Sequence, residues 1–245
     1  MSKYSIVMPA ANEEKTIRQT IEQIMNLKER PLHLYVVMDD YSKDSTEEII
    51  KEEMKKYDRL HLVFYKESKG VATCYLHGFQ VAIDEGADFI IEMDAGGSHN
   101  VQDIPKFLEK LDEGYDCVWG SRFMKGGGVK DLPFYRLFLS RGGTVLSNTV
   151  LGTRLKDMTS GFEAFKADVL KQMNLDMFLS RGHMYQTEMR YYCRNAKSVE
   201  VPIVYNGSDT GLKFKSVTEA LDILFRLKAY EKEVKKKTGN SNEES

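Results

Sequence analysis

The stretch that decides the fold is residues 89–99, Phe89-Ile90-Ile91-Glu92-Met93-Asp94-Ala95-Gly96-Gly97-Ser98-His99. Its apolar beginning predicts a buried strand, and the carboxylate of Asp94 follows at the point where that strand ends. Two glycines, a hydroxyl and an imidazole come next, so little side-chain bulk surrounds the carboxylate. Open α/β sheets bind ligands outside the carboxyl ends of their strands, where a carboxylate can also hold a cation. The stretch therefore predicts a parallel sheet with Asp94 at its ligand-binding edge.

Strands and helices alternate through the first half of the sequence. Asn12 is expected to cap the first helix, and Ser45-Thr46-Glu47-Glu48 matches a capping box for the second. This alternation predicts an α/β fold whose mostly parallel central sheet is flanked by helices on both faces. Strands are expected over 4–8, 32–38, 60–65, 89–93 and 116–119, and helices after Asn12 and over 45–57, 70–85 and 104–112.

The second half of the sequence is less regular. Gly126-Gly127-Gly128 is expected to form a flexible loop. No linker or repeat is evident, so residues 1–230 are expected to form one domain, with halves of about 1–120 and 121–230. The tail over 231–245 is nearly all charged or polar, and we expect it to be disordered. Helices are expected over 168–172, 185–195 and 217–230, and a strand over 199–205.

The composition of the 245 residues is that of an ordinary globular protein, with 42% hydrophobic and 29% charged residues. A formal net charge of -2 argues against a general nucleic-acid binder, so no nucleic-acid partner is expected. The three cysteines form no CxxC pair, which fits a reducing, cytoplasmic setting and gives no sign of a zinc site. The beginning of the chain is too polar for a signal peptide, and no stretch reaches the 18 or so apolar residues of a membrane-spanning helix.

Three further segments place polar groups or small residues at expected strand ends. Val7-Met8-Pro9-Ala10-Ala11-Asn12-Glu13 ends the first strand. Val37-Met38-Asp39-Asp40 ends the second, where carboxylates can accept hydrogen bonds from base N–H groups and ribose hydroxyls. Lys69-Gly70-Val71-Ala72 opens a helix, where small residues let a nucleotide approach backbone N–H groups. Helix capping or loop solvation is the alternative for each segment, and it explains Asp39 least well because an apolar strand precedes it directly.

Together these motifs resemble those of family-2 glycosyltransferases of the GT-A fold, and more narrowly those of polyprenol-phosphate (dolichol-phosphate) mannose synthases. The resemblance runs from about residue 4 to about residue 230, although Ala11 replaces the tyrosine that is usual in the opening motif. It implies a Rossmann-like nucleotide-binding half followed by an acceptor half. The residues that it implies for nucleotide binding are Pro9, Ala11, Glu13, Asp39, Asp40, Gly70, Ala72, Asp94 and Ala95.

Asp94-Ala95-Gly96 occupies the place of the family's D-x-D metal motif. The resemblance implies Mg²⁺ or Mn²⁺ as cofactor and Asp94 as its ligand, because a cation on the diphosphate offsets the charge of the leaving group. Gly96 stands where a second carboxylate would be, so phosphates and water would complete the coordination. Ser98 or His99 could add a ligand, and His99 would shift the preference toward Mn²⁺. The alternative is that Asp94 only caps the following loop and that catalysis has been lost.

The acceptor side of the resemblance rests on arginines and on a serine-glycine motif. Gly120-Ser121-Arg122 and Ser140-Arg141-Gly142 are similar to the family's G-S-R and S-R-G elements, and arginine forks suit phosphate oxygens. Residues 157–162 resemble its D-x-x-S-G-F motif. The implied catalytic residues are Asp94, Arg122 and Asp157, and the implied acceptor- and phosphate-binding residues are Arg122, Arg141, Ser160, Lys213 and Lys215.

The implied activity is inverting transfer of a hexose, with mannose favoured, from a nucleoside-diphosphate sugar such as GDP-mannose to a polyprenyl phosphate (dolichyl or undecaprenyl). A phosphate is ionised near neutral pH and needs no strong general base, which fits a sequence without an evident histidine–carboxylate pair. One alternative is a transferase of the same fold that uses UDP-glucose or a hydroxyl acceptor. Another is a non-catalytic nucleotide-sugar-binding partner. A Rossmann dehydrogenase is not indicated, because no G-x-G-x-x-G follows the first strand.

A lipid acceptor also implies an interfacial surface. We therefore expect a protein peripheral on the cytoplasmic face of a membrane, docked alone or through a membrane-embedded partner protein. The alternative is that about half of the apolar residues of the candidate segment belong to the core. Arginines interrupt this candidate segment, as they do in amphipathic elements at anionic membranes. Its apolar and aromatic residues are Leu132, Phe134, Tyr135, Leu137, Phe138 and Leu139.

Overall fold

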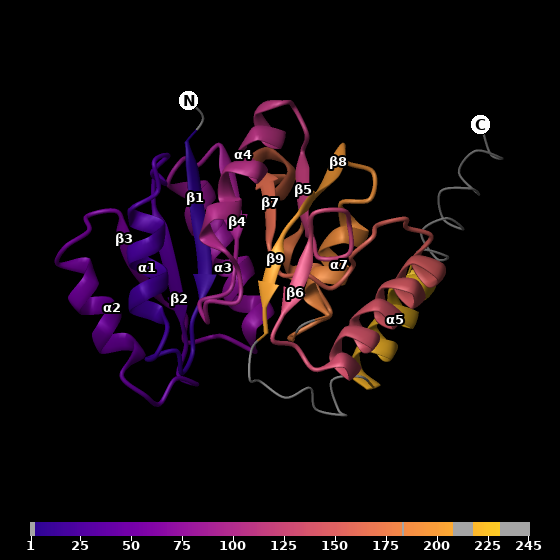
Figure 1. Ribbon diagram of the computed structural model, residues 1–245, viewed down its shortest axis with the longest axis horizontal. Coiled ribbons are helices and arrows are strands. Elements are labelled where there is room, and N and C mark those ends of the chain that lie inside the picture. Colours follow the sequence, from indigo (N-terminus) through magenta and orange to yellow (C-terminus); the bar gives the residue numbers. More distant parts are fainter. Residues whose placement is uncertain (1–2, 183, 208–217, 231–245) are drawn as a thin grey trace.

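The computed structural model describes residues 3–182, 184–207 and 218–230, and a central sheet lies between two layers of helices (Figure 1). The sheet has seven strands in the order β3-β2-β1-β4-β7-β5-β8. Its strands pair in parallel except for β7, which runs antiparallel between β4 and β5. The predicted α/β fold with a mostly parallel sheet is therefore confirmed. The strands are β1 (Tyr4–Pro9), β2 (Leu34–Met38), β3 (Leu60–Phe64), β4 (Phe89–Glu92), β5 (Cys117–Ser121), β7 (Glu163–Lys166) and β8 (Ser198–Pro202).

Each face of the sheet buries its own hydrophobic core, because successive side chains of a strand point to opposite faces. Ile6 and Met8 of β1 belong to one core, and Val7 between them belongs to the other. The first core is covered by α1 (Ile17–Met25), α2 (Thr46–Met54) and α4 (Ile104–Asp112), the last of which follows a short turn, η1 (Val101–Asp103). The second is covered by α3 (Val71–Asp84), α6 (Ala167–Lys171) and α7 (Tyr185–Tyr192), with the turn η2 (Leu175–Met177) between the last two.

The antiparallel strand β7 brings a loop from the second half of the chain to the candidate site. Glu163, the first residue of β7, pairs with Glu92 at the end of β4 and with Trp119 in β5. The segment that precedes Glu163 therefore lies at the same edge of the sheet as the carboxyl ends of the parallel strands. The sequence predicted the motif at 157–162 but neither the strand that follows it nor the direction of that strand.

The remaining elements are the strands β6 (Gly128–Lys130) and β9 (Val204–Asn206), near the middle of the view, and α5 (Phe134–Leu151) with its neighbouring helix, at the end of the molecule opposite α2 (Figure 1). β6 pairs in parallel with β9, so the glycine run expected to be a loop ends in a strand. Helix α5 runs beside the helix at 218–230, and the two share a small apolar cluster with α7. Within the three described ranges, no helix has the length and apolar character needed to cross a membrane. The tail expected to be disordered, 231–245, lies outside these ranges.

Two predicted helix caps are wrong in detail. Asn12 does not cap α1, because it has a φ of 59° and its side-chain oxygen accepts a hydrogen bond from the backbone N–H of Lys43 at 2.8 Å. Ser45 makes no side-chain bond at the beginning of α2. The Asp44 carboxylate accepts the bond from the backbone N–H of Thr46 instead, at 3.1 Å. At both positions a short polar side chain ties loops together and satisfies backbone groups that the local pattern assigned elsewhere.

Candidate active site

The carboxyl edge of the parallel strands gathers the acidic residues expected there. Asp39 directly follows β2, and Asp94 follows β4 after one further residue. These two strands flank β1, whose following loop carries Glu13. Since parallel strands end at a common edge, the three carboxylates come from three adjacent loops at one edge of the sheet.

Helix α3 contacts both aspartates through consecutive residues. The Cys74 sulfur lies 3.8 Å from Asp39 Oδ2, and the Tyr75 hydroxyl donates a hydrogen bond to Asp94 Oδ1 at 3.0 Å. Burial raises the pKa of Cys74 to about 11 and raises the pKa of Tyr75 well above its ordinary value, so both groups keep their protons near neutral pH. Asp39 and Asp94 therefore lie on the α3 side of the sheet, as a common binding site requires.

The imidazole ring of His99 lies beside the second carboxylate oxygen of Asp94. Its Nε2 lies 3.2 Å from Asp94 Oδ2, and only 3% of the residue is exposed. The ring centroid lies 4.8 Å from that of Phe162 and 5.5 Å from that of Tyr205. A backbone bridge also joins His99 to Tyr205 of β9. His99 and Asp94 thus form a histidine–carboxylate pair that was not evident from the sequence, and a direct contact between His99 and a cation stays a prediction.

Glu13 lies against Gly96, two residues beyond Asp94. A Cβ atom placed on Gly96 would lie 3.0 Å and 3.1 Å from the two carboxylate oxygens of Glu13. Thr16 donates a hydrogen bond to Oε2 at 3.0 Å. Burial raises the pKa of Glu13 against the effect of that bond, and the charges of Asp94 and Asp44 raise it further. Glu13 and Asp94 are therefore close enough for their charges to repel each other.

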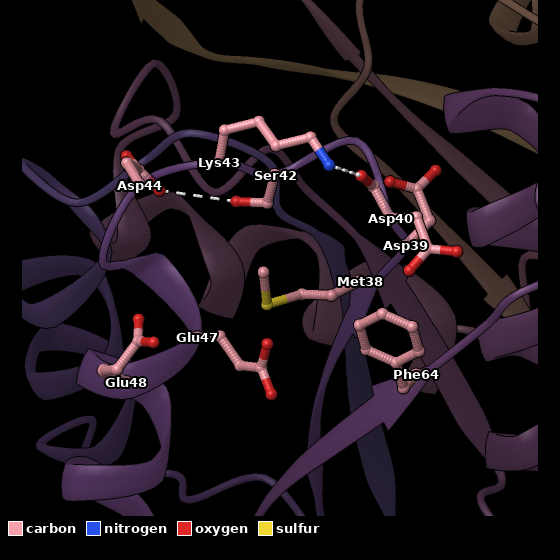
Figure 2. Close-up of a pocket in the computed structure, with 9 residues that line it drawn as sticks. All are labelled: Met38, Asp39, Asp40, Ser42, Lys43, Asp44, Glu47, Glu48 and Phe64. Carbon is pink, nitrogen blue, oxygen red and sulfur yellow. Dashed lines mark hydrogen bonds between the residues drawn. The ribbon is translucent and has the colours of Figure 1, made fainter.

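A cavity of about 260 Å³ opens beside Asp39, between the loop after β2, the beginning of α2 and the end of β3 (Figure 2). Five of its lining residues carry carboxylates, whereas Lys43 bonds the Asp40 carbonyl at 2.6 Å. Such a lining suits hydrogen-bond donors such as base N–H groups and ribose hydroxyls, and it repels phosphates. The lining residues are Met38, Asp39, Asp40, Ser42, Lys43, Asp44, Glu47, Glu48 and Phe64.

The predicted nucleotide contact at the beginning of α3 is covered by another loop. The N–H of Ala72 donates to the Arg181 carbonyl at 3.4 Å, and a Cβ atom on Gly70 would overlap the same carbonyl. The Ala95 carbonyl accepts a hydrogen bond from Thr20 of α1 at 3.2 Å. These two backbone groups have protein partners in this structure, and contacts of the nucleotide with Gly70, Ala72 and Ala95 stay predictions. Contacts of the nucleotide with Pro9, Ala11, Asp39 and Asp40 stay predictions.

Arg122 and Asp157 form a buried ion pair. Arg122 Nε donates to Asp157 Oδ2 at 2.7 Å, and Nη2 donates to Oδ1 at 2.9 Å. Nη2 also donates to the Thr159 hydroxyl at 2.6 Å, and the Arg122 backbone N–H donates to Oδ2 at 3.1 Å. Burial opposes ionisation of Asp157, but the hydrogen bonds and charge of Arg122 outweigh it and lower the pKa of the carboxyl. Asp157 is committed to Arg122, which agrees with an orienting role rather than with proton abstraction.

A second arginine reaches the same place from α5. The guanidinium carbons of Arg122 and Arg141 each lie 5.1 Å from the ring centroid of Phe123, and Arg141 is exposed. The Arg122 guanidinium also lies 5.5 Å from the ring of Tyr205, which packs against His99. Contacts through Tyr205 and His99 therefore connect Arg122 with Asp94, and a shared substrate site stays a prediction.

The other acceptor-side residues are placed less directly. Ser160 is buried, and its hydroxyl accepts a hydrogen bond from the Phe162 backbone N–H at 3.4 Å. Its carbonyl accepts one from Arg190 at 2.8 Å. Ser160 thus shapes the loop, and its contact with an acceptor stays a prediction. Lys213 and Lys215 lie outside the described residues.

A buried ionisable layer beneath Asp94 was not predicted. Tyr185 donates to Glu92 Oε2 at 3.0 Å, and Arg190 pairs with Glu163. Burial raises the pKa of both carboxyls, that of Glu163 to about 8, against the charge of Arg190. Because Glu163 has the arginine, we assign the neutral, protonated state to Glu92. The available signal was the lone glutamate inside the apolar run before Asp94.

The expected cation fits the donors of this edge as a partner of the nucleotide. Among the residues that the structure describes, no three or more His, Cys, Asp and Glu side chains are grouped to hold a metal. The carboxylate oxygens of Asp94 and Glu13 are nevertheless the ligand type that Mg²⁺ and Mn²⁺ take. Further oxygens would come from the diphosphate of the donor, so a cation and a nucleotide would bind here together.

Comparison with known proteins agrees with this geometry. The family model for glycosyl transferase family 2 matches residues 5–174. The polyprenol monophosphomannose synthase of Mycolicibacterium smegmatis is 29% identical over 91% of this chain and 84% of its own length. The undecaprenyl-phosphate mannosyltransferase of Micrococcus luteus is 30% identical over 84% of each chain. The dolichol-phosphate mannosyltransferase of Pyrococcus furiosus is 30% identical over 95% of this chain, which spans 65% of that protein.

Solved structures share the fold at lower identity. The glucosyl-3-phosphoglycerate synthase of Mycobacterium tuberculosis, in complex with Mn²⁺, UDP-glucose and phosphoglyceric acid, superposes with a TM-score of 0.68 at 15% identity. The match covers 91% of this chain and 77% of that one. The same enzyme bound to UDP alone gives a TM-score of 0.66 at 16% identity over 91% and 80% of the two chains. This likeness confirms the GT-A fold and carries no further conclusion.

Proposed function

The chain belongs to glycosyl transferase family 2, and on this premise we propose that it transfers a hexose, with mannose favoured, from a nucleoside-diphosphate sugar to a polyprenyl phosphate. The proposal rests on the observation that a set of carboxylates and a pair of arginines lie at the same edge of the sheet. Carboxylates come from the loops after β1, β2 and β4, and Arg122 and Arg141 flank Phe123 beside them. Three relatives at about 30% identity, named for mannose and a polyprenyl lipid, support the substrate classes.

The donor is proposed to lie along the first half of this edge. Its base and ribose meet Asp39 and Asp40, whose carboxylates accept hydrogen bonds and whose neighbouring cavity repels phosphate. Its diphosphate lies nearer Asp94, where a bound Mg²⁺ or Mn²⁺ supplies charge neutralisation. GDP-mannose is the favoured donor because the names of the relatives give mannose as the sugar.

The reaction is proposed as a single displacement with inversion. An oxygen of the acceptor phosphate attacks the anomeric carbon of the donor, the bond from that carbon to the diphosphate breaks, and the nucleoside diphosphate leaves with the electron pair. A phosphate monoester carries about −1.5 to −2 charges at pH 7, so no side chain has to remove a proton. The residues of the chain must instead position the two substrates and stabilise charge, which fits an Asp157 committed to Arg122.

A lipid acceptor is proposed to bring the protein to the cytoplasmic face of a membrane through α5. Phe134 is 81% exposed and Phe138 is 69% exposed, and Tyr135 and Leu139 between and beside them are also exposed. Arg141 continues the same helix on its exposed side. Exposed aromatics next to arginines match an anionic lipid surface, since the rings enter the interface and the cations meet the headgroups.

The experiment that tests the activity is a donor panel with one short polyprenyl phosphate. GDP-mannose, GDP-glucose, UDP-mannose and UDP-glucose are offered as radiolabelled donors with Mn²⁺ or Mg²⁺, and the label that enters the organic phase is counted. The expected result is label with GDP-mannose and none when the matching polyprenyl alcohol replaces the phosphate. Transfer to the alcohol would contradict a phosphate nucleophile. Binding of a nucleotide sugar without turnover, measured by isothermal titration, would favour a non-catalytic binding partner.

Membrane docking is tested by flotation with vesicles of phosphatidylcholine and phosphatidylglycerol. The chain is expected to float with these vesicles and to stay in the soluble fraction when Phe134 and Phe138 are both replaced by serine. Exposed Tyr41, in the loop between β2 and α2, provides the matched control, because Tyr41→Ser removes a similar exposed ring. Equal flotation of the double variant and the parent would overturn the assignment of α5.

A further inference from the structure

We propose that Glu13 supplies the second carboxylate of the divalent-cation site, in place of the acidic side chain that Gly96 lacks; this inference rests on the proposed nucleotide-sugar transfer. The residue that offers oxygen ligands beside Asp94 then comes from the loop after β1 and not from the loop after β4. Neither the family motif nor the spacing of the sequence assigns Glu13 this part, because it lies 81 residues before Asp94 in the chain.

The Glu13 carboxylate leaves little space for a side chain at position 96. A Cβ atom there would lie 3.0 Å and 3.1 Å from the two oxygens of Glu13, which is closer than most real Cβ contacts. The Glu13 carboxylate therefore lies directly against the point where a side chain of residue 96 would begin. An aspartate at 96 would require the Glu13 carboxylate to shift by a few tenths of an ångström, so a carboxylate from either loop reaches the same part of the site.

Hydrogen bonds also fix the position of Glu13 at the beginning of α1. Its backbone N–H donates to the Thr46 hydroxyl at 2.8 Å, and its carbonyl accepts the N–H groups of Thr16 and Ile17 at 3.0 Å and 2.9 Å. Thr16 also donates its hydroxyl to Oε2 at 3.0 Å, which leaves lone pairs of both oxygens for a further partner. The side chain is thus anchored at the beginning of α1 while its carboxylate faces Gly96.

The negative charges of Glu13 and Asp94 also favour a cation between them. The carboxylate of Asp94 repels that of Glu13, and none of the ion pairs found among the described residues includes Glu13. A divalent cation between the two carboxylates converts this repulsion into attraction. His99 Nε2 lies 3.2 Å from Asp94 Oδ2, and a buried neighbour of this kind helps to orient a metal-binding carboxylate.

Two protein carboxylates make a weak cation site by themselves, so the cation is expected to bind tightly only when a nucleotide is bound as well. The nucleoside diphosphate must supply the remaining oxygens, and Mn²⁺ should bind far better with a nucleotide than alone. Electron paramagnetic resonance of Mn²⁺ measures this directly, without any transfer reaction. The probes are Mn²⁺ alone, Mn²⁺ with GDP and Mn²⁺ with UDP.

The test moves the carboxylate from one loop to the other. Glu13→Ala is expected to weaken binding of Mn²⁺ in the nucleotide complex by about tenfold or more, and Glu13→Gln by a similar factor. The double variant Glu13→Ala/Gly96→Asp should restore binding to within about threefold of the parent, because aspartate then enters the vacated space. Glu14→Ala removes an exposed neighbouring carboxylate and should leave binding unchanged. Circular dichroism and thermal unfolding verify that each variant is folded.

Three outcomes overturn the proposal: binding in both Glu13 variants within about twofold of the parent, no gain on adding Gly96→Asp, or no Mn²⁺ binding by the parent with either nucleotide. The failure of the proposed function is a separate result. If the carboxylate exchange restores Mn²⁺ binding while no donor in the panel gives lipid-linked sugar, the cation site stands and the transfer reaction falls. If transfer occurs but the exchange fails, only the role of Glu13 is lost.

Discussion

Replacing Arg122 by alanine gives the sharpest test of how this site is held together. The change removes two side-chain hydrogen bonds, of 2.7 Å and 2.9 Å, from a carboxylate that is 0% exposed. Asp157 then keeps only local bonds from the Arg122 backbone and from Thr159. Breaking one side of a buried ion pair costs about 3–5 kcal/mol, because the remaining charge is left without compensation. At about 2–4 °C per kcal/mol for a domain of this size, the melting temperature should fall by roughly 6–20 °C.

The assay is urea unfolding of four proteins at pH 7: the parent, Arg122→Ala, Asp157→Leu and the double variant Arg122→Met/Asp157→Leu. The double variant should lose less stability than Arg122→Ala alone, since apolar side chains of similar volume replace a buried pair at little net cost. A loss below about 1 kcal/mol in Arg122→Ala would refute the reasoning, because it would mean that Asp157 is satisfied without the arginine.

The pH dependence of the pair has a definite sign. The pKa of Asp157 is lowered in the folded state by Arg122, against the opposing effect of burial. A depressed carboxyl pKa contributes stability above the unfolded value of about 3.9 and loses it as the pH falls through the folded value. The difference between the parent and Arg122→Ala should therefore be full at pH 7 and should shrink below about pH 4. Transfer by Arg122→Ala has to be measured at a temperature where the variant is folded, so that lost activity reports the site and not unfolding.

Three further predictions follow from single features. Burial raises the pKa of Glu92, so its contribution to stability is full below the unfolded value of about 4.3 and is lost as the pH rises from there toward the folded value. Glu92→Gln should therefore gain on the parent by up to about 1.4 kcal/mol per pH unit above about pH 4.3 in urea unfolding, and parallel curves would contradict this. Gly70→Ala should cost more than about 2 kcal/mol, because φ is 126° and the Cβ would overlap the Arg181 carbonyl; calorimetry checks it. Arg141→Ala should raise KM for the polyprenyl phosphate by about tenfold and leave donor KM unchanged, and the reverse pattern would move Arg141 to the donor side.

The architecture was predictable because its signals are local. Each apolar run that ends in a polar residue became a parallel strand, and the predicted helix at 104–112 has the bounds of α4. Asp39 and Asp94 could be placed on one edge without knowing any contact, since the carboxyl ends of parallel strands necessarily meet there. The fold class and the main acidic residues thus follow from periodicity and from chain direction alone.

What could not be predicted depends on contacts between distant residues. β7 is short and contains Glu163, so nothing local indicates a central strand that runs antiparallel between two parallel ones. The partner of Arg122 lies 35 residues further along the chain, and the sequence therefore left the guanidinium available to a phosphate. Only the fold reveals that its charge is already matched by Asp157. The neutral state assigned to Glu92 has the same origin, because it depends on burial by other elements and on the charge of Glu163 from β7.

The charges of these side chains determine what else the site needs in order to bind its proposed substrates. A donor diphosphate and an acceptor phosphate together carry several negative charges, and they must approach carboxylates at 13, 39 and 94. Arg122 brings no net charge, because Asp157 neutralises it, so its contribution to an acceptor consists of oriented N–H groups. Exposed Arg141 adds one positive charge at the acceptor end. At the donor end, where Asp94 and Glu13 already repel each other, a divalent cation would be required for the diphosphate to bind at all, before any leaving group departs. Metal removal should consequently raise the Kd of the nucleotide sugar and not only lower kcat, and unchanged donor binding after chelation would show that some other group neutralises the diphosphate.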